Sequence, residues 1–255
     1  MGRLDGKVAV ITGGAGGIGK AAARMFVAEG ADVLLVDRDE AALKAAAAEI
    51  GSNRVATCVA DVTSPESNQA MVQAAVERFG GIDVFLANAG IEGKVAPISE
   101  TEVEMFDRVM AVNVRGVWLG LKYVMPEIAK RGGGSVVITS SVAGVGGSAG
   151  LAPYVTSKHA VIGLMRSASL EGAPMKIRVN TVNPSPVETR MMRSLEEGMA
   201  PGNGEVVHES LKQRIPLGRY GEPDDIARLM LFLSSDDAAF LTGGVYMADG
   251  GMTAS

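Results

Sequence analysis

The order of apolar and amphipathic segments constrains the fold of this chain more than any other feature. Seven short runs are apolar on both faces and rich in β-branched residues, as in strands of a parallel sheet that is covered by helices on each side. Six longer segments with helical periodicity lie between them. This alternation predicts an α/β fold, a doubly wound parallel sheet of about seven strands with helices on both faces. The strand-like runs are 7–12, 31–37, 54–60, 82–88, 134–140, 176–182 and 244–250, and the helical segments are 18–29, 39–49, 65–79, 102–130, 154–171 and 223–235.

The chain contains no repeat, linker or low-complexity tract, so we expect residues 1–255 to form a single domain. One segment, 186–217, interrupts the alternation and is rich in Gly, Pro and Met. A long irregular insertion in a compact domain is typically a lid or a binding loop, and flexible methionine side chains suit contact with a ligand. We therefore expect a substrate lid at 186–217; the alternative is a disordered surface excursion.

The charge balance and the cysteine count exclude several classes of partner. The formal net charge is −5 and the basic residues are scattered, so we expect no nucleic-acid partner. No run approaches the roughly 18 apolar residues that a membrane span needs. The one cysteine, Cys58, allows no intrachain disulfide and favours a reducing compartment. We expect a cytoplasmic protein without a membrane partner or a metal site.

A glycine-rich loop, VITGGAGGIGK, lies between the first predicted strand and the first predicted helix. Gly14, Gly16 and Gly19 fit the G-x-G-x-x-G dinucleotide pattern, whereas Gly13, Gly17 and Gly19 fit T-G-x-x-x-G-x-G. Both spacings favour the same chemistry, because glycines permit a sharp turn and the close approach of a pyrophosphate. The helix N-terminus adds free N–H groups and the positive end of a dipole. The loop therefore predicts dinucleotide binding.

An acidic residue, Asp37, ends the second predicted strand 18 residues after Gly19. This is close to the spacing of about 20 residues at which an acid hydrogen-bonds the adenosine ribose of NAD. A 2′-phosphate beside the carboxylate would meet like-charge repulsion, so the sequence favours NAD over NADP. Arg38 opposes this interpretation, because an arginine after the strand can pair with that phosphate. Asp37 could instead be a helix N-cap or a solvated loop charge.

Tyr154 and Lys158 are four residues apart in a helical pattern and therefore share one face of the helix. A free phenol has a pKa near 10, which is too high for a general base at neutral pH. A neighbouring ammonium group stabilises the phenolate and is expected to lower that pKa. The pair could then exchange a proton with an alcohol or a ketone. The alternative is an amphipathic helix that carries an ordinary surface lysine.

Several short motifs occur in a characteristic order along the chain: TGGAGGIG, then NAG at 88–90, VITSS at 137–141 and YVTSK at 154–158. In this combination the chain resembles the short-chain dehydrogenase/reductase family over almost its whole length. The resemblance implies a Rossmann-like fold and hydride transfer between a nicotinamide cofactor and a secondary alcohol or ketone. Homotetramers are usual in this family, so we expect one here.

The resemblance also implies a catalytic set of four residues. Tyr154 would be the acid/base, and Lys158 would lower its pKa and hold the nicotinamide ribose. Ser141, 13 residues before Tyr154, would hydrogen-bond the reacting oxygen. Asn113 would fix a water molecule in the proton relay. The neighbouring Ser140 does not have the spacing of the family pattern.

Cofactor contacts are implied in three groups: the glycine loop, the ends of the following strands, and the segment NPSPVET. Ser185 stands in that segment where the family usually has glycine, which places the local turn in question. Asp61 could also be a loop acid close to a helix N-cap. The residues implied are Gly13, Gly17, Ile18, Gly19, Asp37, Arg38, Asp61, Val62, Asn88, Ala89, Gly90, Tyr154, Lys158, Pro184, Val187 and Thr189.

The residues expected in the substrate pocket are small or apolar, and none is a basic residue that could clamp an anion, which favours a neutral secondary alcohol or ketone such as a cyclic alcohol, a steroid or a sugar. Arg190 and Arg193 would reverse this expectation if they turned inward. His159 is expected to pack or cap beside the Tyr–Lys face, and His208 to lie on the surface of the lid. The expected pocket residues are Ser141, Val142, Ser148, Leu151, Tyr154 and Pro186.

Two other functions remain open from the sequence. A 3-oxoacyl-[acyl-carrier-protein] reductase has the same fold, but it would be expected to use NADPH and to carry a basic patch for its acidic carrier. Asp37 and the acidic net charge oppose that function. A non-enzymatic NAD-binding sensor is the second alternative. The presence of both Tyr154 and Lys158 opposes it.

Overall fold

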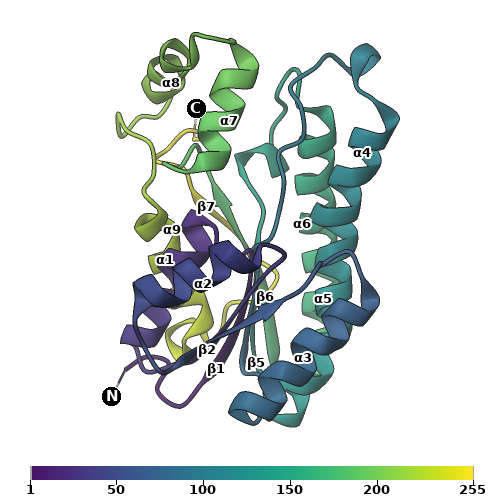
Figure 1. Cartoon of the computed structure of the whole chain (residues 1–255), viewed down its shortest axis with the longest axis vertical. Helices are drawn as coiled ribbons and strands as arrows, with labels where there is room; N and C mark the ends of the chain where they lie inside the picture. The colour runs from purple at the N-terminus through teal and green to yellow at the C-terminus, as the bar shows by residue number, and fades with distance from the viewer. Residues whose placement is uncertain (1, 255) are drawn as a thin grey trace.

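Seven segments form strands in the computed structural model, which describes residues 2–254 (Figure 1). They are β1 (Val8–Thr12), β2 (Asp32–Asp37), β3 (Val55–Val59), β4 (Val84–Ala87), β5 (Gly134–Thr139), β6 (Ile177–Pro184) and β7 (Val245–Ala248). All pair in parallel in one sheet with the order β3-β2-β1-β4-β5-β6-β7. The predicted doubly wound fold is confirmed.

Nine α-helices connect the strands within the described residues. They are α1 (Gly17–Ala28), α2 (Glu40–Ile50), α3 (Pro65–Phe79), α4 (Val103–Met110), α5 (Gly116–Lys130), α6 (Ala152–Gly172), α7 (Arg190–Met199), α8 (Gly204–Gln213) and α9 (Pro223–Ser234). Among residues 2–254, no helix is both long and apolar enough to cross a membrane.

The side chains of the strands alternate between two hydrophobic cores, one on each face of the sheet. Ala9 and Ile11 of β1 pack in the core formed with α1, α2 and α9. Val10 points the other way, into the core formed with α3, α5 and α6. Figure 1 shows these two groups of helices on opposite sides of the sheet. This arrangement explains why the strands are apolar on both faces.

The predicted helix 102–130 is interrupted. The helix α4 ends at Met110, a single π-helical turn covers Ala111–Arg115, and α5 begins at Gly116. Asn113 lies in this turn. One inserted residue barely disturbs the apolar periodicity on either side, so the pattern gave no sign of it. Single π-turns within helices often mark functional sites.

The sequence predicts an irregular insertion at 186–217. The structure instead has two helices in this segment, α7 and α8. The Thr189 side chain caps α7 by accepting a hydrogen bond from the Met192 N–H at 3.3 Å. The Pro and Gly residues cluster at the turn between the two helices, where Gly202 has a φ of 75°. Because α7 begins shortly after β6 ends, the helix pair lies beyond the carboxyl edge of the sheet (Figure 1).

The strand order reverses between β1 and β4, which are neighbours although β2 and β3 lie between them in sequence. The chain leaves β1 towards one side of the sheet and leaves β4 towards the other. Ligands of doubly wound sheets bind in the crevice that this divergence opens at the carboxyl edge. The glycine loop follows β1 and the motif NAG follows β4, so both lie at this point.

Candidate active site

The glycine loop has the geometry of the T-G-x-x-x-G-x-G spacing. Gly13 has a φ of 64°, in the left-handed region that favours glycine. A Cβ on Gly13 would lie 2.9 Å from Ala89 Cα, and one on Gly19 would lie 2.3 Å from Gly13 O. The loop is thus folded tightly onto itself and onto the residue that follows Asn88.

The N-terminus of α1 is open to an anion. Its N-cap, Gly16, offers no side-chain hydrogen bond, and the first turn contains no acidic residue. Among the described residues, the N–H groups of Gly17, Ile18 and Gly19 have no hydrogen-bond partner. Uncapped N–H groups at the positive end of a helix dipole fit the pyrophosphate of a dinucleotide.

Asp37 lies beside this loop rather than capping a helix. One of its carboxylate oxygens accepts a hydrogen bond from the Arg38 N–H at 2.8 Å, and the other faces the Ala15 N–H at 3.4 Å. The N-cap of α2 is Asp39, whose side chain accepts from the Ala42 N–H. The Arg38 side chain is exposed and makes no ion pair within the described part of the chain. The position of Asp37 fits a ribose hydroxyl.

Asn88 joins the glycine loop to the neighbouring strands. Its Nδ2 donates to Thr12 O at 3.2 Å and to Gly13 O at 3.3 Å, while its Oδ1 accepts from Thr139 Oγ1 at 3.0 Å. The Ala89 N–H donates to Thr12 Oγ1 at 3.2 Å. The hydrogen bonds of the Asn88 side chain therefore join the ends of three strands. The backbone of this segment, rather than the Asn88 side chain, borders the proposed cofactor crevice.

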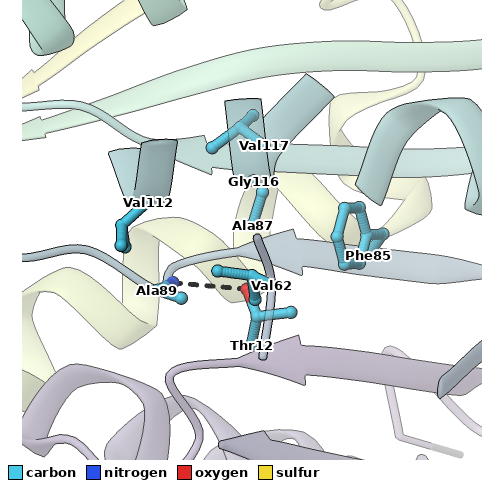
Figure 2. Close-up of a pocket in the computed structure, with 8 residues that line it drawn as sticks. All are labelled: Thr12, Val62, Phe85, Ala87, Ala89, Val112, Gly116 and Val117. Carbon is cyan, nitrogen blue, oxygen red and sulfur yellow. Dashed lines mark hydrogen bonds between the residues drawn. The ribbon is translucent and has the colours of Figure 1, made fainter. Parts of the chain in front are cut away.

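A void of about 10 Å³ lies behind this segment and is about large enough for one water molecule. Figure 2 shows Val62 and Ala89 on its wall. Asp61, the residue before Val62, accepts hydrogen bonds from the N–H and hydroxyl of Thr63, so it forms a local turn and does not cap α3. A void this small cannot admit adenine, which must bind outside it. Its lining is Thr12, Val62, Phe85, Ala87, Ala89, Val112, Gly116 and Val117.

Tyr154 and Lys158 share one face of α6, as predicted from their spacing. The Lys158 ammonium lies 5.4 Å from the centre of the Tyr154 ring and donates a hydrogen bond to Thr139 O at 2.8 Å. Lys158 is buried and has no carboxylate partner among residues 2–254. Gly90 lies close by, since a Cβ there would be 3.6 Å from Lys158 Nζ. The pair therefore faces the motif NAG across the crevice.

The two pKa values shift in the direction that favours neutral groups. Burial raises the pKa of Tyr154 to about 12, although hydrogen bonding by Ser141 opposes the shift, and the charge of Glu92 adds to it. Burial also lowers the pKa of Lys158 to about 8. The expected lowering of the phenol pKa by Lys158 is thus not seen in this geometry. The ammonium group faces Thr139 O and the ring rather than the phenol oxygen.

The two adjacent serines have different environments. Ser140 is 2% exposed, and its hydroxyl donates to Lys158 O at 3.0 Å. Ser141 is only partly buried, and its hydroxyl is near enough to Tyr154 to influence the phenol. It accepts from the Ala143 N–H at 3.1 Å. Of the two hydroxyls, the Ser141 hydroxyl is the one that a bound alcohol could reach.

Asn113 fixes the segment that follows β4. Its Oδ1 accepts from the Ile91 N–H at 2.8 Å, and its Nδ2 donates to Ile91 O and to Ser157 Oγ. The side chain is buried and has both amide hydrogens in use. Its Nδ2 therefore has no hydrogen left to donate to a water molecule, and its backbone lies in the π-helical turn.

The segment NPSPVET lies against the glycine loop. A Cβ on Gly17 would be 3.2 Å from Thr189 Cγ2. Pro184 ends β6, and Val187 pairs with Gly221 in an isolated parallel bridge. Ser185 does not have a positive φ, so the turn forms without the glycine that the family usually has here. The structure thus brings together the two segments that the sequence assigns to the nicotinamide and to the pyrophosphate.

The expected substrate residues lie in unlike environments. Val142 and Pro186 are partly buried, Ser148 is exposed, and Leu151 is 5% exposed and belongs to the packed start of α6. The sequence gave no sign of Glu92, a partly buried residue whose charge acts on Tyr154. Its carboxylate forms no ion pair or hydrogen bond among residues 2–254. Position 92 lies in no motif, so only the fold could identify it.

The expectation that His208 lies on the surface of the lid is wrong, because the residue is only 7% exposed. It packs on the Tyr220 ring with the ring centres 4.1 Å apart. His159 is exposed, and its Nδ1 lies 3.0 Å from Val155 O within α6. Arg193 does not turn towards the substrate side but pairs with Glu188 and Glu196. The described residues contain no group of three side chains arranged to hold a metal ion.

Comparison with known proteins agrees with this geometry. The family profile described as "Enoyl-(Acyl carrier protein) reductase" matches residues 13–253. A levodione reductase of Leifsonia aquatica is 39% identical over 99% of this chain and 96% of its own length. A crystal structure of levodione reductase superposes with a TM-score of 0.97, at 39% identity and over 99% of each chain. The chain belongs to the short-chain dehydrogenase/reductase family.

Other members of this family with similar sequences differ in their named activities. Cyclohexanol dehydrogenase of Acinetobacter sp. (strain SE19) is 36% identical over 98% of this chain and 96% of its own length. A 3-oxoacyl-[acyl-carrier-protein] reductase of Thermotoga maritima is 38% identical over 98% of this chain and 99% of its own length. Family membership implies a nicotinamide cofactor, but identity at this level does not choose among substrates.

Tyr154 should stay protonated far into the alkaline range when no cofactor is bound. A pKa of about 12 means that tyrosinate is almost absent at the pH where a free tyrosine is half ionised. The ultraviolet absorbance of wild type minus Tyr154→Phe should therefore show no tyrosinate signal between about pH 8 and pH 11. A signal with a midpoint below about pH 10 would contradict the burial effect and support the lowering by Lys158.

Proposed function

We propose that this chain is an NAD-dependent oxidoreductase that transfers a hydride between the nicotinamide and the carbon of a neutral secondary alcohol or ketone. One observation carries the proposal. Tyr154, Lys158 and Ser141 meet at the carboxyl edge of the sheet, next to a glycine loop with open N–H groups. The bound cofactor supplies the hydride chemistry, and the protein supplies binding, orientation and proton transfer.

Three residues of the chain have separate roles in binding the substrate and moving the proton. The Ser141 hydroxyl holds the reacting oxygen next to the Tyr154 phenol. In reduction Tyr154 donates its proton to that oxygen, and in oxidation it removes the proton of the alcohol. Lys158 binds the nicotinamide ribose and carries a positive charge at neutral pH, since its pKa remains about 8. With the ribose bound, this charge stabilises the phenolate that oxidation requires.

We propose NAD as the working cofactor, with NADP as the less favoured one. The Asp37 carboxylate borders the glycine loop and accepts backbone hydrogen bonds there, so a 2′-phosphate would meet a fixed negative charge. The exposed Arg38 could offset this charge only by turning back over the loop. We further propose a single-domain protein that works as a homotetramer in the cytoplasm, with α7 and α8 as its substrate lid.

A neutral substrate is supported by the charges around Tyr154. Glu92 raises the pKa of the phenol and makes no ion pair among the described residues, so it would repel a carboxylate brought to the same place. Arg193 is occupied by two glutamates of the lid. Cyclohexanol, which one relative is named for, is a neutral cyclic secondary alcohol. We propose a substrate of this class.

The 3-oxoacyl-[acyl-carrier-protein] reductase function stays as the second candidate, because a relative of 38% identity has that name. It would require NADPH at a site bordered by Asp37 and the docking of an acidic carrier on a chain with net charge −5. Both requirements oppose the charges of this protein. The NAD-binding sensor is opposed by the assembled Tyr154, Lys158 and Ser141.

Replacing Tyr154 by Phe should abolish turnover and leave cofactor binding intact. The loss of the proton donor should reduce kcat by about 10²–10⁴-fold. The measurement is NAD reduction with a panel of secondary alcohols, beside calorimetric titration with NADH. Tyr123→Phe, on α5 outside the site, should keep full turnover. Wild-type protein that binds NADH but turns over no alcohol or ketone would support the sensor instead.

Replacing Asp37 by Asn should reduce the preference for NADH over NADPH by about tenfold or more, because the repulsion of the 2′-phosphate is removed. Both cofactors are titrated at one salt concentration. The matched control is Asp39→Asn, two residues away, since Asn also caps helices well and Asp39 does not touch the loop. Wild type that binds NADPH as tightly as NADH would contradict the proposed cofactor.

Replacing Glu92 by Gln should shift the pH profile of alcohol oxidation to lower pH. Glu92 raises the pKa of Tyr154, so its removal makes the phenol easier to deprotonate. The variant should also gain several-fold in kcat/KM for a carboxylate-bearing alcohol relative to a neutral one. Glu100→Gln, an exposed carboxylate on the same connection, should change neither quantity. If the pH profile of alcohol oxidation is unchanged in Glu92→Gln, Glu92 does not act on Tyr154.

A further inference from the structure

A cluster of polar side chains lies in the lid, apart from Tyr154 and Lys158. It consists of Glu188, Arg193, Glu196, His208 and Tyr220, and is called the lid cluster below. Three of the five are nearly inaccessible: Glu196 is 2% exposed, Tyr220 3% and His208 7%. Buried charges are costly and are kept only where they are paired. The proposed proton transfer uses none of these residues.

The Glu196 carboxylate is the centre of the lid cluster. Its Oε2 accepts from Arg193 Nη1 at 2.9 Å, and its Oε1 lies 3.0 Å from His208 Nδ1. The contact with His208 joins α7 to α8, whereas the contact with Arg193 lies within α7; Arg193 Nη1 in turn lies 2.8 Å from His208 Nδ1. Burial favours the protonated form of Glu196, but His208, Tyr220 and Arg193 stabilise the carboxylate and hold its pKa below the usual range. Glu196 is therefore a charged group that the two helices share.

Glu188 connects the lid cluster to the proposed nicotinamide segment. It lies between Val187 and Thr189, and its carboxylate pairs with Arg193 Nη2 and lies 3.7 Å from His208 Nε2. Its N–H donates to Gly221 O at 2.9 Å, next to Tyr220, and the Gly221 N–H donates to Pro186 O at 3.0 Å. A shift of α7 and α8 would consequently move the backbone of this segment.

We propose that Glu196 is a positioning residue, which fixes α7 and α8 to the segment Pro186–Thr189 and so sets the position of the nicotinamide end of the cofactor. This inference rests on the proposed function, because it assigns that segment to the nicotinamide. Glu196 does not touch the reacting atoms. It acts through Arg193 and His208 on Glu188, whose two neighbours in sequence make the contacts.

If Glu196 positions only the nicotinamide end of the cofactor, its replacement should affect ligands with and without nicotinamide differently. ADP-ribose has the pyrophosphate and adenosine of NAD but no nicotinamide, so it should use the glycine loop and Asp37 without the segment Pro186–Thr189. Glu196→Gln removes the shared charge with little change of shape. It should weaken NADH binding roughly tenfold and leave ADP-ribose binding unchanged. A role confined to lid stability would not distinguish the two ligands.

Calorimetric titration of the full-length protein with NADH and ADP-ribose tests this. Glu209→Gln is the matched control on α8, because Glu209 is exposed and, among residues 2–254, pairs with Lys212 alone; it should leave both affinities unchanged. If Glu196→Gln does not fold, His208→Gln decides, since it removes the ring but keeps an amide donor for Glu196. Equal effects on both ligands, or none, would overturn the inference. Failure of wild type to bind either ligand would instead overturn the proposed function.

Discussion

The Asn88 side chain joins the ends of three neighbouring strands, and the site depends on this connection. Its amide bonds the carbonyl groups of Thr12 and Gly13 at the end of β1, and its oxygen accepts from Thr139 at the end of β5. The Thr139 carbonyl in turn holds Lys158. A chain of hydrogen bonds therefore runs from the glycine loop to the acid/base helix. It links the proposed pyrophosphate loop to the proposed acid/base pair across the point where the strand order reverses.

Burial at this edge decides the charge state of the acid/base pair. It raises the pKa of Tyr154 and lowers that of Lys158, so each group is driven towards its neutral form. At neutral pH the pair alone therefore holds almost no phenolate, contrary to what its spacing suggests. Additional positive charge beside the phenol, or a ribose that draws the ammonium group away from Thr139, would favour the phenolate. On the proposed mechanism, alcohol oxidation therefore depends on the bound cofactor as well as on the two side chains.

The parts of the site that the sequence predicted are those carried by local patterns. A strand, a glycine loop and a helix follow each other along the chain, and so do Tyr154 and Lys158 on one helical face. The rest depends on packing between distant segments. The two helices at 186–217 were missed because Gly and Pro mark their turns more strongly than their short helical patterns mark the helices. His208 was placed on the surface because its partners, Glu188, Glu196 and Tyr220, come from three other segments.

On the proposed function, different parts of the molecule determine the reaction class and the choice of substrate. Ser141 follows β5 and the glycine loop follows β1, and these strands are tied to the two cores of the sheet, whereas Tyr154, the proposed proton donor, lies on α6. Val95 packs against Gly150 on one side and against Gly198 of α7, in the proposed lid, on the other. Asn113 anchors the segment that carries Glu92, and the lid cluster anchors α7 and α8. Each of these two segments thus has a buried polar anchor, and the anchor of the Glu92 segment is shared with α6, because Asn113 Nδ2 also donates to Ser157 Oγ, beside Lys158.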